Sequence, residues 1–75
     1  MDQEYIGKII RFHRKQAGLT QEELATLAGI GKTAVFDVEK GKLSIRFSTL
    51  LKLLYALNIQ ITYDSKIMEH FNENS

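Results

Sequence analysis

The stretch "TQEELATLAGIGKTAVFDVEKG", residues 20–41, decides the fold. Thr20 and Glu23 have the spacing of a capping box, so we expect a helix over Gln21–Ala28 that ends at Gly29. A second helix is expected over Lys32–Glu39 after a short turn that contains two glycines. Two short helices joined by such a turn predict a helix-turn-helix unit.

The tripeptide Gly31-Lys32-Thr33 also occurs in phosphate-binding loops, which makes nucleotide binding an alternative. Such a loop needs a glycine five residues before Gly31, and that position holds Thr26. It also follows a buried strand, whereas "QEELATLAG" has helical spacing. The sequence therefore argues against a nucleotide site and favours the start of a second helix.

Two further helices flank this unit. The first is expected from about Gln3 to Ala17, and its apolar stripe includes His13, which we interpret as a packed, hydrogen-bonded core residue. Val35 and Val38 are expected to point inward, and Leu19, Leu24 and Leu27 are expected to supply apolar contacts around the second helix. The fourth helix, about Ser48 to Leu57, is apolar on most sides, which favours burial on more than one face.

The segment "NIQITYD" alternates apolar and polar residues, which predicts a strand over about 58–63. Because a lone strand leaves its backbone groups unpaired, we expect antiparallel pairing with a second copy about a two-fold axis. The alternative is an extended, solvated tail. The expected class is all-α, a small helix-turn-helix bundle with a C-terminal strand pairing across a homodimer, within a domain over 1–64 and a polar tail over 65–75. The expected dimer contacts are Leu54, Leu57, Ile59, Ile61 and Tyr63.

Composition excludes several classes of function. The chain has 75 residues and no cysteine, and His13 and His70 lie too far apart to suggest a metal site. The sequence shows no arrangement of nucleophile, base or paired carboxylates, so we expect neither an enzyme nor a cofactor. No apolar run could cross a membrane and the N-terminus is no signal peptide, so a cytoplasmic protein is expected. Residues 1–63 carry a charge of +3 and residues 64–75 carry −2, which permits an anionic partner.

The run "IIRFHRKQAGLTQEELATLAGIGKTAVFDVEKGK" resembles the Cro/C1-type, or Xre-like, helix-turn-helix family, whose fold is lambda-repressor-like. The matching features are Arg14, "GLTQEELA", Gly29, the two valines of the second helix and "EKG". The continuation "LLKLLYALNIQITYD" is similar to HipB-like antitoxins, which pair a short strand across a dimer and partner HipA-like kinase toxins.

The resemblance implies roles for particular residues. Gln21 and the loop residues Lys42 and Arg46 would contact phosphates, and Lys15 could reach another. Arg14 and Glu39 would form a structural ion pair between the first and third helices. The implied DNA-binding set is Gln21, Lys32, Thr33, Phe36, Asp37, Lys42 and Arg46. Gln21, Lys42 and Arg46 are also residue types that occur on ordinary solvated surfaces.

Three positions depart from the family pattern. Asp37 would be repelled by phosphates unless it accepts from cytosine N4 or pairs with a cation such as Lys40. Phe36 could press on a thymine methyl, contact a protein partner or fold under the loop. Gly31 replaces the usual Ser or Thr cap of the recognition helix.

These features together predict a dimeric transcriptional repressor that binds double-stranded DNA sequence-specifically at an inverted-repeat operator. The similarity to HipB-like antitoxins implies an autoregulating antitoxin of a HipBA-like operon, with a HipA-like kinase as a possible partner. The alternative is a protein-interaction module that neutralises a toxin without itself being a strong DNA binder.

Overall fold

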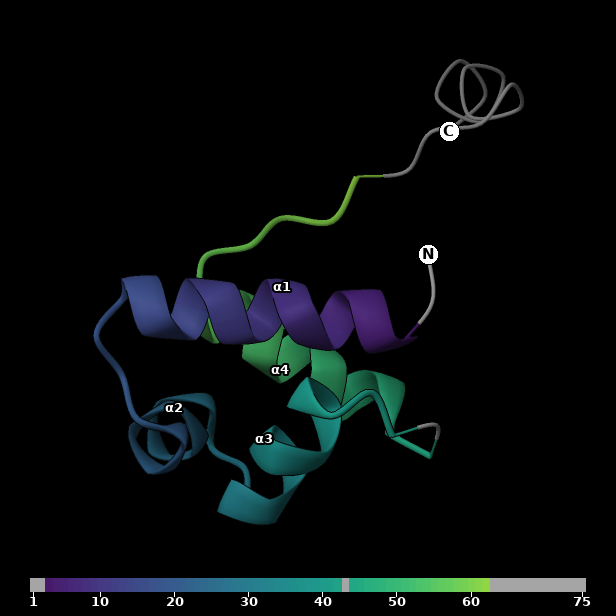
Figure 1. Ribbon diagram of the computed structural model, residues 1–75, viewed down its shortest axis with the longest axis horizontal. Helices are drawn as coiled ribbons and strands as arrows, with labels where there is room; N and C mark the ends of the chain where they lie inside the picture. The colour runs from purple at the N-terminus through teal and green to yellow at the C-terminus, as the bar shows by residue number, and fades with distance from the viewer. Residues whose placement is uncertain (1–2, 43, 63–75) are drawn as a thin grey trace, which may run out of the picture.

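A computed structural model describes residues 3–42 and 44–62 of the chain, with side chains from Tyr5 onward. The described residues form four helices: α1 (Gln3–Gln16), α2 (Gln21–Ala28), α3 (Lys32–Glu39) and α4 (Phe47–Ala56) (Figure 1). The bounds of α2 and α3 match the prediction, α1 ends one residue earlier than predicted, and α4 begins and ends one residue earlier than predicted. The all-α helix-turn-helix prediction is confirmed.

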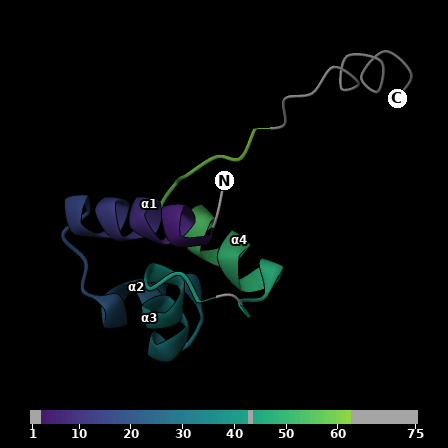
Figure 2. The ribbon, with the colours of Figure 1, turned by 45° about the vertical axis from the view of Figure 1, so that its right-hand side comes forward.

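The helices pack around one small core. α3 contacts α1, α2 and α4, and α2 also contacts α4, so α3 is the element that the other three share. Figures 1 and 2 both show α2 and α3 on one side of α1. The predicted inward orientation of Val35 and Val38 is confirmed. The buried hydrophobic residues are Ile10, Leu24, Ala25, Val35, Val38, Leu53 and Leu54.

All four helices end in the same way. After each helix one residue takes a left-handed backbone conformation, and the next N–H donates to a carbonyl five residues back, which is the Schellman motif. At the first three ends this residue is a glycine, and at the end of α4 it is Asn58, with φ 58°. The residues after the first, second and fourth ends, Leu19, Ile30 and Ile59, pack against the core and thereby fix the direction of the chain.

Gly7 lies inside α1, where the sequence gives no reason for a glycine. A Cβ atom built on Gly7 would collide with the carbonyl oxygen of Val38 and would lie 3.0 Å from that of Glu39. The backbone of α1 therefore crosses the C-terminal end of α3 at a distance that leaves no room for a side chain. The sequence pattern, in which the other glycines mark helix ends and turns, does not indicate this contact.

The prediction for His13 is confirmed. Its ring is half-buried, Nδ1 lies 2.7 Å from the carbonyl oxygen of Ile9, and Phe12 packs edge-on against it. By contrast Ala17, which was expected to be the last residue of the first helix, follows the end of α1 and is exposed. Leu27 is also exposed, at 60%, rather than buried beside Leu24.

The capping box predicted at the start of α2 is confirmed. The Thr20 N–H donates to Glu23 Oε1 at 2.8 Å, and the Glu23 N–H donates to Thr20 Oγ1 at 3.0 Å. The hydrogen bond from the Thr20 backbone, and then contact with its hydroxyl, lower the pKa of the Glu23 carboxyl below its ordinary value. The box therefore binds the charged form of Glu23 in preference to the neutral one.

Because the folded pKa of Glu23 is lowered, its stabilising effect is complete above its ordinary value near pH 4.5 and is lost as the pH falls through the folded value. We expect Glu23→Gln, whose amide oxygen accepts the same hydrogen bond without titrating, to lose less stability between pH 5.5 and 3 than the unsubstituted chain. Urea unfolding followed by circular dichroism at several pH values measures this difference. Parallel pH profiles for the two proteins would show that Glu23 does not contribute in this way.

Residues 58–62 leave α4 as a turn followed by extended chain, on the side of the bundle that carries α1 (Figure 1). Within the described part of this single chain they join no sheet, so pairing across a dimer stays a prediction. Tyr63, His70 and the tail over 65–75 lie outside the described residues. Among the residues that are described, no helix has the length and apolar character needed to span a membrane.

Candidate nucleic-acid interface

The outward face of α3 carries the residues predicted to meet DNA. Lys32, Thr33 and Phe36 are exposed and Asp37 is half-buried, whereas Val35 and Val38 on the opposite face are buried. Residues one turn apart on a helix lie on the same face, so these four side chains form one continuous surface. A helix of eight residues with one free side can lie in a major groove, which is wide enough to admit it.

A buried ion pair holds α3 against α1. Arg14 donates from Nε to Glu39 Oε2 at 2.7 Å and from the terminal Nη2 to Oε1 at 3.0 Å, and Nη1 donates to the Leu19 carbonyl oxygen at 2.9 Å. The exposed fractions of the two charged side chains are 10% and 4%. The hydrogen bond with Glu39 raises the pKa of Arg14 above its ordinary value against the opposing effect of burial. The structure thus places Arg14 and Glu39 in the predicted ion pair.

Gln21, the first residue of α2, is fixed by the same ion pair. Its side-chain nitrogen donates to Glu39 Oε1 at 3.2 Å. An amide nitrogen has two N–H groups, so one donor remains for another acceptor. The residue therefore stands at a helix N-terminus, next to α3, with its side chain already oriented.

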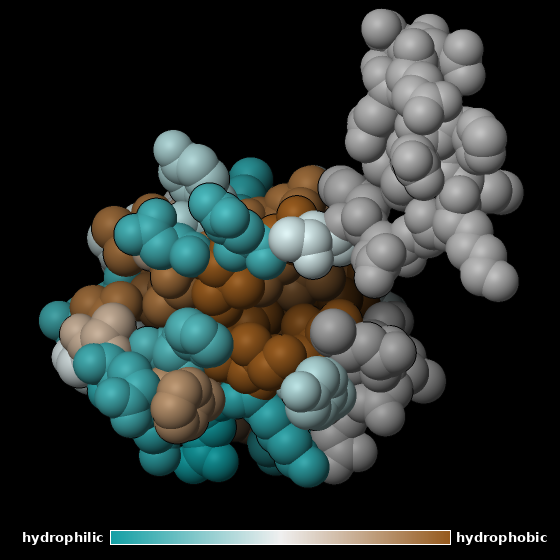
Figure 3. Space-filling model, turned by 90° about the horizontal axis from the view of Figure 1, so that it is seen from above, coloured by the Kyte–Doolittle hydropathy of each residue, from teal (hydrophilic) through white to brown (hydrophobic). Residues whose placement is uncertain are grey.

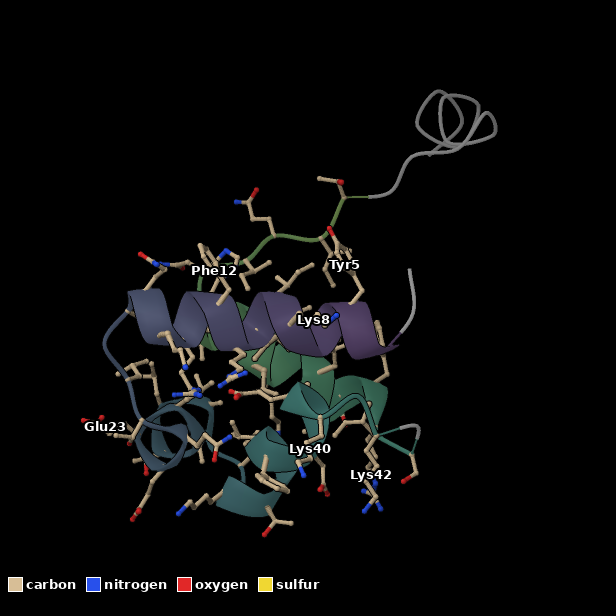
Figure 4. All side chains as sticks on the ribbon, viewed as in Figure 1. Tyr5, Lys8, Phe12, Glu23, Lys40 and Lys42 are labelled. Atoms are coloured by element: carbon tan, nitrogen blue, oxygen red, sulfur yellow. The ribbon has the colours of Figure 1, made fainter. Side chains whose placement is uncertain are left out.

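The charged residues at the end of α3 pair differently from the prediction. Asp37 is paired with Lys42, at 3.5 Å between Oδ2 and Nζ, and not with Lys40. The Lys40 ammonium instead lies over the ring of Phe36, 4.8 Å from its centroid. The cause is the Schellman turn at Gly41, in which the Lys42 N–H donates to the Asp37 carbonyl oxygen and brings the two residues together. Figure 4 shows Lys40 and Lys42 on the side of the bundle that carries α3.

Four exposed cations, Arg11, Lys15, Lys32 and Arg46, have no acidic partner in the described ranges 3–42 and 44–62. A hollow of about 280 Å³ lies above the buried ion pair, and its rim includes Arg11, Gln21, Phe36 and Lys40. Sequence analysis did not assign Arg11 or Lys40 to the DNA-binding surface. Arg11 could have been found, because it precedes Arg14 by one helical turn and so shares its face of α1.

The residues predicted for dimerisation divide into two groups. Leu54 is buried in the hydrophobic core of the single chain, and Leu57 and Ile59 are half-buried against that core. Ile61, by contrast, is 42% exposed. The exposed apolar residues nearby are Leu27, Leu51 and Tyr55, of which Tyr55 is 87% exposed. Two neighbouring hollows share Leu51 and Tyr55 and extend to Leu27 on one side and to Ile61 on the other. We call the surface of Leu27, Leu51, Tyr55 and Ile61 the α2–α4 apolar face.

A second apolar region lies on the side of α1 that faces away from α2 and α3. Tyr5 and Phe12 are 55% and 60% exposed, and Figure 4 shows both side chains pointing away from the helix-turn-helix unit. Figure 3 looks onto this side and shows apolar side chains gathered across the middle of the face, with polar side chains around them.

Comparison with known proteins places this arrangement in a family. Residues 10–63 match the family model HTH_3, described as "Helix-turn-helix". The chain belongs to this family. It is 38% identical over 56 residues to the uncharacterized HTH-type transcriptional regulator y4mF of Sinorhizobium fredii. The matched residues cover 75% of this chain and 74% of that protein. It is 33% identical over 58 residues to the control protein C.SmaI of Serratia marcescens, over 77% of this chain and 69% of that one.

Solved structures show the same fold. The restriction-modification controller protein C.AhdI of Aeromonas hydrophila superposes with a TM-score of 0.70 at 36% identity, over 77% of this chain and 88% of that one. A chain in the structure of the HipA-HipB-O2-O3 complex superposes with a TM-score of 0.79 at 24% identity, over 88% and 93%. These matches identify a helix-turn-helix transcriptional regulator and confirm the predicted family.

The structure brings most of the predicted DNA-contacting residues of this regulator to one side. Lys32, Thr33, Phe36 and Asp37 share a face of α3, and Gln21 and Lys42 are joined to that helix by the contacts given above. Arg46 caps the start of α4 and is exposed. Their roles toward DNA stay predictions.

Proposed function

We propose that this chain is a sequence-specific, DNA-binding transcriptional repressor that acts as a homodimer. The observation that carries the proposal is the polar outer face of α3, which stays open while the buried Arg14–Glu39 pair fixes the helix from behind. A rigid helix pays little ordering cost on binding, and this rigidity supports specific recognition.

In the proposed complex the N-terminal half of α3 enters the major groove. Lys32 would donate to guanine O6 and N7, and the Thr33 methyl would meet a thymine methyl. Phosphate contacts would come from the cations without acidic partners that flank this helix, from Gln21 at the start of α2, and from Lys42. The set beyond Lys32 is Arg11, Lys15, Gln21, Lys42 and Arg46.

The α2–α4 apolar face supports the dimer part of the proposal. Leu27, Leu51, Tyr55 and Ile61 are exposed side by side, and residues 60–62 join no sheet within the described part of the chain. Two copies joined here would present two α3 helices to successive turns of the duplex. Selection of bound duplexes from a random library should then enrich an inverted repeat with half-site centres about 10–10.5 base pairs apart. Enrichment of a lone half-site would contradict the dimer.

Lys32→Ala and Arg46→Ala test the two kinds of contact, because each removes one exposed cation that lacks an acidic partner. Lys32→Ala should weaken binding to the selected duplex by about 1–3 kcal/mol and relax specificity at one position of each half-site. Arg46→Ala should weaken binding to all sequences alike and reduce the slope against salt concentration by about one. Gel shifts on selected and scrambled duplexes at several salt concentrations measure both. Equal losses on both duplexes for Lys32→Ala would remove its base-reading role.

Two kinds of operon are candidates for control by this regulator, a toxin–antitoxin operon and a restriction-modification operon. The similarity of residues 50–64 to HipB-like antitoxins supports an autoregulating antitoxin that neutralises a HipA-like kinase. The fold shared with a chain of the HipA-HipB-O2-O3 complex, at 24% identity, supports the architecture alone. The identities of 33% and 36% to C.SmaI and C.AhdI favour instead a controller of a restriction-modification system.

The neighbouring genes and a rescue assay discriminate these roles. An adjacent kinase gene whose product arrests growth, and whose arrest this chain relieves, supports the antitoxin. Adjacent endonuclease and methyltransferase genes support the controller. Relief of arrest by a Lys32→Ala, Gln21→Ala double variant that no longer binds DNA would show that neutralisation is separable from repression. A chain that relieves arrest but never binds DNA would be the interaction module alone.

A further inference from the structure

Phe36 is a large apolar side chain in a polar position. It is 43% exposed on the outer face of α3, between Lys32 one turn before it and Lys40 one turn after it. Phe36 is not a member of the hydrophobic core, to which α3 contributes Val35 and Val38. A ring left in this place points to a contact that the single chain does not make.

The ring is held in a defined position. The Lys40 ammonium lies 4.8 Å from the ring centroid, and the hollow above the buried ion pair has Phe36 on its rim together with Arg11 and Gln21. The cation attracts the face of the ring and orients it. The sequence alternative in which Phe36 folds under the loop is thereby wrong, because the ring stays at the surface of α3.

The charges around the ring identify the kind of partner. Lys32 and Arg11 are exposed and have no acidic partner in the described part of the chain, and Lys40 covers the ring. An apolar protein surface docked on Phe36 would have to desolvate these cations, which is unfavourable. A partner for this surface must offer acceptors to the cations and an apolar group to the ring. DNA offers both, because phosphates line the major groove and the 5-methyl group of thymine projects into it.

We infer that Phe36 reads the 5-methyl group of a thymine in each half-site, an inference that rests on the proposed function. Phe36 follows Lys32 by four residues, about 6 Å along the axis, and base pairs are stacked about 3.4 Å apart. The thymine therefore lies within about two base pairs of the pair that Lys32 contacts. Lys40 has a positioning role, since it holds the ring without touching the base.

Replacement of thymine by deoxyuridine tests this inference, because it removes the methyl group and leaves every hydrogen-bonding group in place. The probe is the duplex selected from the random library, with one thymine of each half-site replaced at a time. Loss of one buried methyl should weaken binding about fourfold per half-site and about fifteenfold for a dimer on two half-sites. Replacement of a thymine in the spacer serves as the matched control and should change nothing.

Substitutions in the protein form the second part of the test. Phe36→Ala should remove the discrimination at one thymine of each half-site and leave it unchanged at the thymine assigned to Thr33. Phe36→Leu should keep part of the discrimination at the first of these. Lys40→Met should reduce it while the melting temperature stays unchanged. Equal binding at every thymine by the unsubstituted chain, selected half-sites without a thymine, or discrimination that Phe36→Ala leaves unchanged at every thymine would each overturn the inference but not the proposed function. Failure of the selection to enrich any sequence would overturn both.

Discussion

Arg14→Ala is expected to remove about half of the free energy of unfolding of the domain at 25 °C. The substitution removes both hydrogen bonds to Glu39, whose side chain is 4% exposed, and so leaves a buried carboxylate without its cation. Breaking a buried pair in this way costs about 3–5 kcal/mol. A domain of this size has a total free energy of unfolding of about 4–11 kcal/mol. Urea unfolding followed by circular dichroism measures the loss.

Glu39→Gln is the matched variant for this prediction. Its amide can still accept from Arg14, and its loss should be smaller than that of Arg14→Ala because no unpaired carboxylate remains buried. The double variant Arg14→Met, Glu39→Leu should recover most of the lost stability, since apolar residues of similar volume often replace a buried ion pair without cost. A urea midpoint for Arg14→Ala equal to that of the unsubstituted chain would contradict the role of the pair as the brace behind α3.

Gly7→Ala is expected to destabilise the domain by about 1 kcal/mol, although alanine normally stabilises a helix relative to glycine. Alanine within a helix is normally more stable than glycine by about 1 kcal/mol. Here the added Cβ collides with the carbonyl oxygen of Val38 and lies 3.1 Å from the carbonyl carbon of Glu39, so α1 and α3 must move apart. Overpacking of this kind costs about 1–3 kcal/mol.

Gly31→Ser is the control for an added side chain at a glycine of the same domain. A Cβ at Gly31 meets nothing within 4 Å, and its φ of −76° suits any residue. The serine hydroxyl can also cap α3, which has no side-chain cap, so a gain of a few tenths of a kcal/mol is expected. Thermal melts of the three proteins give the comparison. A Gly7→Ala variant as stable as the unsubstituted chain would show that α1 and α3 do not approach as closely as described.

Local signals in the sequence were sufficient for the four helices and their order. The capping box at Thr20 and Glu23 and the glycine that ends α2 are short-range features, and each acts on residues within one turn. The inward side of α3 followed from its two valines. The Arg14–Glu39 pair, by contrast, joins residues 25 positions apart, and only the resemblance to a known family indicated it.

The remaining features depend on packing between helices, which periodicity does not describe. Gly7 looks like a neutral surface glycine until α3 is placed against it. Asp37 pairs with Lys42 rather than with Lys40, because the left-handed turn at Gly41 brings Lys42 back to Asp37, and Lys40 lies over the ring of Phe36 instead. The apolar pattern of α4 indicated a second buried face, and the structure shows that Leu51 and Tyr55 are the residues of α4 exposed there.

The central claim is that the polar face of α3 lies along the bases of a duplex. The most direct test is a titration of the ¹⁵N-labelled chain with the selected duplex, followed by amide and side-chain NMR shifts and by intermolecular contacts to the DNA. We expect the largest shifts at Gln21 and at Lys32, Thr33, Phe36 and Asp37, with contacts from the last four to base protons. Shifts confined to the outer side of α1 around Tyr5 and Phe12, with α3 unchanged at saturating DNA, would contradict the account.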